Sequence, residues 1–190
     1  MNEHLMENEA FLTGSLVARC KKGDLNAARQ LYEQYSKGMY HICLRLLNNV
    51  PDAEDMLQEA FYQVFKSIDS YRGEATIGSW IKSIVVNKCL NQLKKKKPVF
   101  VEADSHEFVE EEGVDEQQYA YTIENVKKAI GALPDGYRVV LSLYLFENYS
   151  HRQIAETLNI SESTAKTQYM RAKQKVREWV QKQMENSHSE

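Results

Sequence analysis

Apolar side chains recur every three or four residues along most of this 190-residue chain, and no stretch alternates apolar and polar residues as a strand does. That repeat matches the turn of an α-helix, which contains about 3.6 residues, whereas a half-buried strand needs a repeat of two. Only eight glycines and three prolines are present, so few residues favour long loops or breaks in the helices. We therefore predict an all-α fold.

Charge divides the chain into three parts. Residues 99–120 contain eight Asp or Glu residues and no Lys or Arg, while residues 12–98 and 121–183 are each net basic. The acidic segment lacks helical periodicity and crowds like charges together, which is typical of a flexible linker. We expect two small helical domains joined by it. Whether it is a solvated spacer, repels DNA phosphates or lies in a basic channel of a partner is left open.

The C-terminal part contains well-defined helix signals. Ser150 and Gln153 form a capping box that starts a helix at about His151. Asn159 ends that helix in the left-handed conformation, and Ser161 caps the next. The expected buried residues are Ile154, Ala155 and Leu158 on the first helix and Ala165, Tyr169, Ala172, Val176 and Val180 on the second. Two helices with so tight a corner have the geometry of a DNA-binding helix-turn-helix.

The outward face of the second helix is polar and basic. Hydroxyl groups near a helix start suit phosphate oxygens, and Lys and Arg one turn further on can reach base edges in a major groove. An ordinary helical hairpin with a solvated basic face is the alternative. The candidate DNA-binding residues are Ser163, Thr164, Lys166, Thr167, Met170, Arg171 and Lys175.

The N-terminal part is predicted to begin with a helix from Leu12 to about Cys20, followed by a helix capped by Asp24. A third helix restarts after Pro51 with Asp52 as its N-cap. Its outer face displays Asp55, Gln58 and Glu59 as a compact polar and acidic patch, which we name the acidic patch. A solvated surface and a docking site for another protein both explain this patch.

Tyr71 and Trp80 flank a polar, glycine-containing loop in which a base could stack outside the duplex. The helix after this loop ends in the lysine run Lys94–Lys97. A lysine run alone is more typical of a solubilising surface. Next to the aromatic loop and exposed amides, it predicts a surface that follows a phosphate backbone. The exposed candidates on this helix are Lys82, Asn87, Lys88, Asn91 and Lys94.

The sequence suggests no metal or cofactor. The chain has three cysteines, Cys20, Cys43 and Cys89, which lie far apart in the sequence. Because their number is odd and their spacing wide, we predict buried thiols rather than disulfides or a zinc site. The five histidines are scattered without metal or catalytic spacing. No apolar run approaches membrane-spanning length and the polar start is no signal peptide, so we expect a cytoplasmic protein without direct membrane insertion.

Four segments, in this order, resemble bacterial RNA polymerase sigma factors of the sigma-70 family, specifically the extracytoplasmic-function (ECF, group 4) type. The resemblance covers residues 12–182 and implies a dissociable initiation factor, responsive to stress or envelope signals, that directs core RNA polymerase to promoters. The four segments are DAEDMLQEAFYQVF, YRGEATIGSWIKSIVVN, ALPDGYRVVLSLYLFENYS and IAETLNISESTAKTQYMRAKQKV.

The resemblance implies that residues 12–98 form a sigma-2-like domain, which docks on polymerase, reads the −10 element and melts DNA. The acidic patch matches the family motif that docks on the coiled coil of the β′ subunit. The loop from Tyr71 through Arg72 to Trp80 would capture a flipped base of the nontemplate strand. On the next helix, Asn87 and Asn91 would grip that strand while Lys88 and Lys94 contact phosphate.

Residues 121–183 would form a sigma-4-like domain that reads the −35 element. Gln168 stands where many family members have Arg, which weakens any transfer of a −35 consensus because Gln prefers an adenine edge and Arg a guanine edge. The implied partners are core polymerase through its β′ and β subunits, double- and single-stranded promoter DNA, and a membrane-bound anti-sigma factor. Lys166, Met170 and Arg171 match base-facing positions, and Ser163, Thr164, Thr167 and Lys175 match backbone-facing ones.

Two other classes of protein also use a helix-turn-helix. A DNA-cutting enzyme such as a serine recombinase needs a mixed α/β catalytic domain, but no strand pattern precedes the hairpin. A self-sufficient repressor or activator needs a dimerisation or ligand-sensing domain, and it would bind its duplex tightly without polymerase. The sequence therefore favours an initiation factor that is not an enzyme.

Overall fold

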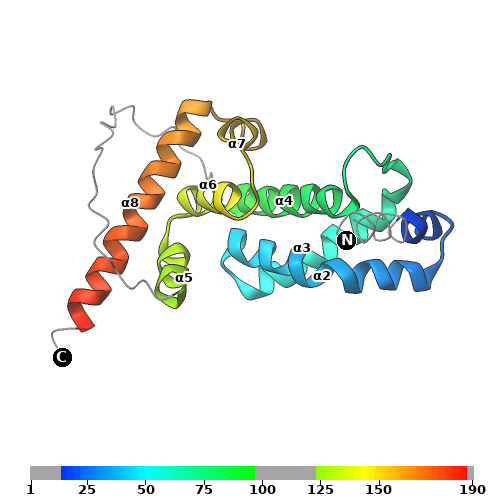
Figure 1. The fold of residues 1–190 in the computed structure, drawn as a ribbon, viewed down its shortest axis with the longest axis horizontal. Helices are drawn as coiled ribbons and strands as arrows, with labels where there is room; N and C mark the ends of the chain where they lie inside the picture. The colour runs from blue at the N-terminus through cyan, green and yellow to red at the C-terminus, as the bar shows by residue number, and fades with distance from the viewer. Residues whose placement is uncertain (1–13, 97–122, 188–190) are drawn as a thin grey trace, which may run out of the picture. The chain divides into compact units, whose positions relative to one another are not determined.

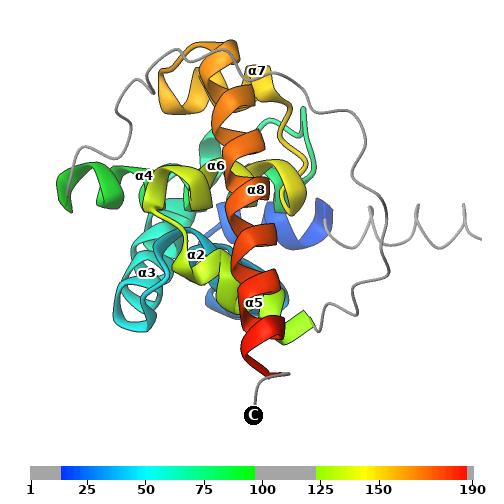
Figure 2. The same ribbon diagram turned by 90° about the vertical axis from the view of Figure 1, so that its left-hand side faces the viewer.

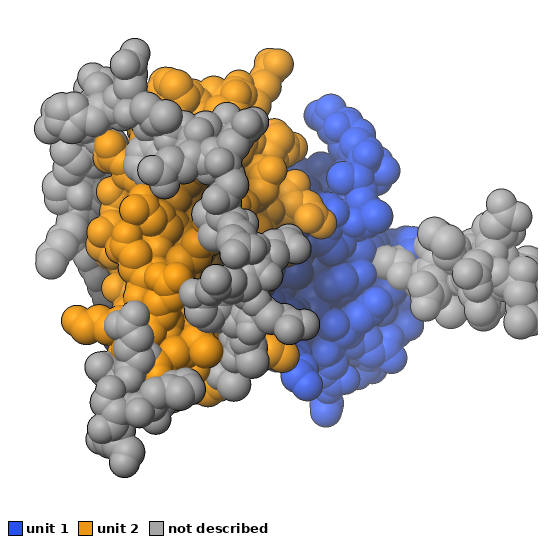
Figure 3. Space-filling view, turned by 60° about the vertical axis from the view of Figure 1, so that its left-hand side comes forward, with its two compact units in different colours: residues 1–92 blue, residues 93–190 orange. Residues whose placement is uncertain are grey.

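The computed structural model describes residues 14–96 and 123–187, and its regular structure in these ranges is entirely helical (Figure 1). The chain divides into two compact units, Met1–Gln92 and Leu93–Glu190, which Figure 3 colours separately. The all-α prediction is confirmed. The acidic segment 99–120 lies outside the described residues.

Unit 1 is built on a helical hairpin. The Asp24 carboxylate caps the first long helix by accepting from the backbone N–H groups of Asn26 and Ala27 at 2.9 and 3.1 Å. A hydrogen bond from Arg19 also holds the pKa of that carboxyl below its usual value. The helices are residues 14–21, α2 (Leu25–Leu47), α3 (Val50–Lys66), the 3₁₀ turn η1 (Ile68–Ser70) and α4 (Ile77–Lys96), which belongs to this unit as far as Gln92.

The prediction that Asp52 is an N-cap is wrong. Asn49 caps α3, and its side-chain oxygen accepts the backbone N–H of Asp52 at 3.0 Å. Pro51 lies within the first helical turn, where the N–H that proline lacks would have no intrahelical acceptor. The helix therefore begins before the proline rather than after it.

The core of unit 1 lies between the apolar faces of its helices, and α2 and α3 pack against each other as the two arms of the hairpin (Figure 1). Alanines 27, 53 and 60 are completely buried, which lets helix backbones approach closely. Phe65, on α3, is only half-buried. Cys20, Cys43 and Cys89 are free and buried, which confirms their prediction as buried thiols.

Unit 2 is organised around its last helix, against which the other three pack (Figure 2). Leu133, Leu141 and Ala172 are at the centre of an apolar cluster completed by half-buried side chains such as Ile130 and Val176. The buried Arg138 guanidinium donates to the Leu133 carbonyl at 2.9 Å, which closes the corner between the first two helices. These helices are α5 (Ile123–Ala132), α6 (Asp135–Leu145), α7 (His151–Leu158) and α8 (Glu162–Ser187).

The predicted helix-turn-helix is confirmed in its local details. The capping box of Ser150 and Gln153 starts α7, and Asn159 ends it in the left-handed conformation with a φ of 57°. The Ser161 hydroxyl then accepts the backbone N–H of Thr164 at 3.0 Å and caps α8. All three apolar residues predicted on α7 are buried, as are Ala165, Ala172 and Val180 on α8, while Tyr169 and Val176 are half-buried.

The left-handed corner at Asn159 makes a testable prediction for stability. Asn159→Ala should lower the free energy of unfolding by about 1 kcal/mol, because the short polar side chain of Asn can offset the left-handed conformation with local hydrogen bonds and the methyl group of Ala cannot. Asn159→Gly should remain near wild type, since glycine adopts this conformation freely. Denaturant unfolding followed by circular dichroism measures both. Glu156→Ala, an exposed change in the same helix, serves as a control; equal stability of the Ala and Gly variants would contradict the assignment.

Candidate nucleic-acid interface

The loop between η1 and α4 holds two aromatic rings beside each other. The Tyr71 hydroxyl donates to the Ala75 carbonyl at 2.6 Å across the loop, and Gly73 turns the chain with a φ of 79°. The Tyr71 and Trp80 ring centroids are 5.5 Å apart. The Thr76 hydroxyl accepts the Ser79 backbone N–H at 3.2 Å, which caps the start of α4. Local hydrogen bonds therefore give the loop a defined shape.

This loop borders an open hollow of about 490 Å³, which we name the aromatic hollow. A hollow of this volume can accept a nucleobase, and the Tyr71 and Trp80 rings offer it surfaces on which to stack. Arg72 and Glu74 add one charge of each sign at its edge. Its lining residues are Ser70, Tyr71, Arg72, Glu74, Ala75, Ser79, Trp80 and Ser83.

Tyr35 of α2 supports α4 next to this hollow, a contact that the sequence did not indicate. A Cβ on Gly78 would lie only 3.0 Å from Cε1 of Tyr35, so the glycine makes room for the ring. Burial raises the pKa of Tyr35, and nearby Tyr71 raises it further. Tyr35 belongs to the apolar repeat of α2, so the sequence pattern did not distinguish it from an ordinary core residue.

The predicted strand-gripping residues lie along α4. Asn87, Asn91 and Lys94 are exposed, while Lys82 and Lys88 are half-buried. These amides and ammonium groups can bind phosphate and base edges.

The acidic patch is exposed on α3, as predicted for Asp55, Gln58 and Glu59. Glu59 forms an ion pair with Lys88, with 3.3 Å between Oε2 and Nζ, so the patch and the α4 surface are in direct contact. Tyr62, which sequence reasoning missed, is 69% exposed and continues this face one helical turn beyond the patch. The sequence could have indicated Tyr62, because it is an aromatic residue at an outward-facing position of an amphipathic helix.

The outward face of α8 carries most of the residues predicted for double-stranded DNA. Ser163, Lys166 and Lys175 are exposed, and Thr164, Thr167, Met170 and Arg171 are half-buried. Lys166 pairs with Glu162 at 2.9 Å, and this hydrogen bond lowers the pKa of the Glu162 carboxyl. A phosphate that binds Lys166 would therefore compete with a carboxylate of the same helix.

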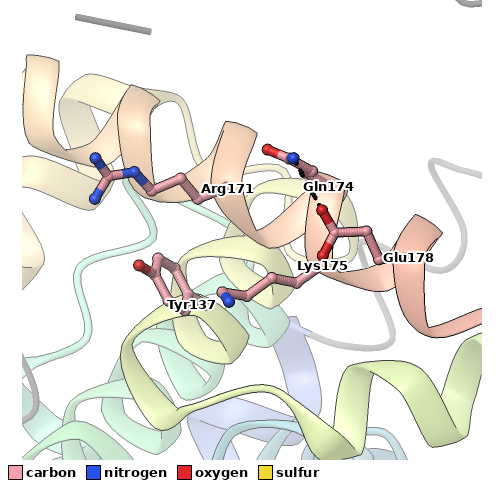
Figure 4. A pocket seen from close by; sticks show the side chains of 5 residues that line it. All are labelled: Tyr137, Arg171, Gln174, Lys175 and Glu178. Atoms are coloured by element: carbon pink, nitrogen blue, oxygen red, sulfur yellow. Dashed lines mark hydrogen bonds between the residues drawn. The ribbon is translucent and has the colours of Figure 1, made fainter. Parts of the chain in front are cut away.

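Arg171 and Lys175 line a shallow hollow of about 290 Å³ together with Tyr137 of α6 (Figure 4). The Lys175 ammonium lies 5.8 Å from the centroid of the Tyr137 ring. Gln174 donates to Glu178 at 2.9 Å on the other side. Cations and an aromatic ring are thus available together along this part of α8.

Gln168 does not lie on that surface, although it was predicted among the −35 contacts. Its side chain is buried at 4% exposure, and its amide oxygen has no hydrogen-bond partner. Position 168 lies three residues after the buried Ala165 and four before the buried Ala172, which puts it on the inner stripe of the helix. Gln168 is therefore removed from the DNA-facing set.

His151, at the start of α7, is held in an aromatic cluster. Its ring stacks on Tyr144 with centroids 4.4 Å apart and meets the edge of Tyr169 at 5.3 Å. Nδ1 is buried without a hydrogen-bond partner. Burial lowers the pKa of His151, Lys166 lowers it further, and Glu162 opposes the change. The sequence pattern alone had not indicated this cluster, since the histidines are scattered along the chain.

Fold and surfaces together define a two-unit helical protein with a helix-turn-helix and a second polar surface beside an aromatic hollow. Two family models match the chain: sigma-70 region 2 at residues 31–99, and sigma-70 region 4 at residues 123–176. The ECF RNA polymerase sigma factor SigW of Bacillus subtilis is 30% identical over 173 residues, covering 85% of this chain and 92% of the relative. The ECF RNA polymerase sigma-E factor of Escherichia coli K12 is 26% identical over 178 residues, covering 87% and 93%.

The chain belongs to the ECF sigma factors of the sigma-70 family. It is thus a transcription initiation factor, the specificity subunit that binds core RNA polymerase and promoter DNA.

Solved structures support the fold. The sigma factor RpoE from Bartonella quintana, crystallised with the anti-sigma factor NepR, aligns with a TM-score of 0.54 at 19% identity, covering 80% of this chain and 96% of that one. CnrH in complex with the cytosolic domain of CnrY aligns with a TM-score of 0.54 at 16% identity, covering 89% and 97%.

Within residues 14–96 and 123–187, no group of three or more His, Cys, Asp or Glu side chains is arranged to hold a metal ion. Among the helices of these same ranges, none is both long and apolar enough to cross a membrane.

The burial of Gln168 leads to a paired prediction. Gln168→Met should leave promoter binding by the holoenzyme unchanged, and it should stabilise unit 2, because a buried unpartnered amide oxygen costs about 1–3 kcal/mol. Lys166→Met should weaken promoter binding, because it removes a charged contact to a base edge that is worth about 1–3 kcal/mol. Binding titrations at several salt concentrations measure both. Weaker binding by Gln168→Met without any loss of stability would return this residue to the interface.

The environment of His151 predicts a pH dependence of stability. Because its pKa is lowered in the fold, the unfolded chain takes up the proton first as the pH falls below about 6.5. The free energy of unfolding should therefore decrease between neutral and mildly acidic pH, and His151→Gln should lose part of that decrease. Denaturant unfolding at a series of pH values tests this. His41→Gln, a change at an exposed histidine, should retain the wild-type profile.

Proposed function

We propose that residues 12–98 dock on polymerase, read the −10 element and melt the promoter, while residues 121–183 read the −35 element. The observation that carries this proposal is the aromatic hollow at the start of α4, followed by exposed amides and lysines along the same helix. A hollow with stacking surfaces suits an unpaired base, whereas the outward face of α8 suits a duplex groove.

Melting in this proposal requires no chemical step by the protein. Unstacking a base costs roughly a few kcal/mol, and its capture in the aromatic hollow offsets that cost. The chain therefore acts through binding energy alone and is not an enzyme. It works in the cytoplasm and associates with the nucleoid when active.

The acidic patch is proposed to dock on the coiled coil of the β′ subunit. Asp55, Gln58 and Glu59 support this because they are exposed together, and Tyr62 adds an aromatic contact of the kind that contributes strongly to protein interfaces. The β subunit would be contacted elsewhere on the chain. Each DNA-binding unit is weak alone, and the linker raises the effective concentration of one when the other is bound. Both promoter elements are therefore required.

Regulation by a protein partner is also proposed. The aligned RpoE and CnrH structures are complexes with an anti-sigma factor and with the cytosolic domain of CnrY, respectively. A membrane-bound anti-sigma factor that covers the DNA-binding faces and the acidic patch would keep this chain inactive until a stress or envelope signal releases it.

A defined transcription assay tests the proposal. Core polymerase from a bacterium is mixed with a promoter library and either the wild-type chain or the double variant Asp55→Ala/Glu59→Ala. We expect start sites with the wild type, which also reveal the promoter sequence. The variant should lose activity at least tenfold, since truncating one partner of a buried, hydrogen-bonded charge pair in an interface costs about 2–5 kcal/mol.

The control is Glu33→Ala/Glu156→Ala, which removes the same charge from two exposed carboxylates in ordinary ion pairs on α2 and α7. It should retain activity. If no start site appears and the protein alone shifts a short duplex at physiological salt, the initiation mechanism fails and the repressor class replaces it.

A further inference from the structure

Lys21, at the end of the helix 14–21, reaches the loop that borders the aromatic hollow. Its ammonium group donates to the carbonyl of Tyr71 at 2.7 Å and lies 3.4 Å from the carbonyl of Asp69. These contacts join segments 48 and 50 residues apart in the sequence. A helix outside the aromatic hollow therefore holds the chain at the point where η1 ends and the loop begins.

The Tyr71 carbonyl needs such a partner because of its place in the chain. Tyr71 terminates η1 in an extended conformation, with its own N–H bonded to the carbonyl of Ile68 at 3.2 Å. Carbonyls at a helix end have no following N–H in the helix to accept from. Lysine offers three donors on one charged group, and hydrogen bonds from a charged donor are stronger than neutral ones. Lys21 can therefore bind both carbonyls together.

The two anchors of Tyr71 act on opposite ends of the residue. Lys21 holds its main-chain carbonyl, and the Ala75 carbonyl accepts from its side-chain hydroxyl at 2.6 Å. The ring between these anchors faces Trp80 at a centroid distance of 5.5 Å. Gly73, within the same loop, adds conformational freedom through its positive φ. Loss of Lys21 would free the main-chain carbonyl and leave Tyr71 held by its N–H and its hydroxyl.

We propose that Lys21 is a positioning residue for base capture: its ammonium holds the Tyr71 backbone so that the Tyr71 ring is set in place before a base arrives. Preorganisation of this kind increases affinity because the loop does not have to lose conformational freedom on binding. The inference rests on the proposed capture of a base by the aromatic hollow. Lys21 lies outside the loop. It would act by ordering the loop and not by touching the base.

The sequence provides a matched control at the next position. Lys22 has the same charge, is also exposed and adjoins the turn at Gly23. Lys21→Met and Lys22→Met thus remove one positive charge each from adjacent positions and change the long-range attraction to DNA similarly. Lys21→Arg keeps a charged donor that can reach two carbonyls.

The test uses holoenzymes assembled from core polymerase and the full chain. The probe is a forked duplex with the −10 sequence selected in the transcription assay, in which each single-stranded nontemplate base is replaced in turn by an abasic site. The measured quantity is the lifetime of the complex with the intact probe divided by the lifetime with the abasic probe. For the wild type we expect a ratio of about ten at the captured position, because one stacked base contributes that much or more.

Lys21→Met should reduce this ratio to about three or less, because a less firmly held ring captures the base less well. Lys22→Met should keep the wild-type ratio, and Lys21→Arg should restore most of it. A merely structural role would lower all lifetimes equally and leave the ratio unchanged. Thermal unfolding of each variant shows whether the fold is retained.

The possible failures are distinguishable. If the wild type shows no position with a raised ratio, and Trp80→Ala does not differ from it, the proposed capture of a base is wrong. If the wild type shows the ratio and Lys21→Met matches Lys22→Met, base capture stands and the role of Lys21 is overturned.

Discussion

Close packing of helices at buried alanines is the constraint on which the rest of the structure depends. Ala27, Ala53 and Ala60 in unit 1 and Ala165 and Ala172 in unit 2 have no exposed surface. A side chain this small lets a second helix approach closely, and a larger one would have to push it away. Each alanine therefore fixes the rotation of its helix about its axis. That rotation determines which polar residues face outward and are available to polymerase or DNA.

Helix α8 illustrates the consequence. With Ala165 and Ala172 inward, Lys166 faces solvent while Gln168 is buried. Two positions only two residues apart point to nearly opposite sides of a helix, so they cannot both lie on its DNA-facing surface. Family resemblance had assigned both to that surface, since resemblance compares positions and does not measure their orientation.

Two ion pairs within the chain involve residues of the proposed partner-binding surfaces. Glu59 of the acidic patch pairs with Lys88 on α4, and Glu162 pairs with Lys166 at the start of α8. Exposed pairs of this type contribute about 0–1 kcal/mol, so a phosphate or a protein partner can replace either member at small cost. The cations are thus held near the positions proposed for their DNA contacts without being blocked. Exchange of this kind between internal and external partners is sensitive to salt.

The sequence by itself determined the helical fold class, the helix-turn-helix with its caps at Ser150, Asn159 and Ser161, and the buried stripes, because these follow from periodicity and from contacts between residues close in the chain. The sequence pattern placed the start of α3 wrongly at Asp52. Both Asn49 before Pro51 and Asp52 after it are suitable N-cap residues, and the local pattern does not choose between them. Only the tertiary structure decided that Lys21 meets the Tyr71 carbonyl, that Tyr35 packs against Gly78 and that Glu59 pairs with Lys88. Those contacts join residues distant in the chain, and their geometry depends on how the helices pack, which no local pattern records.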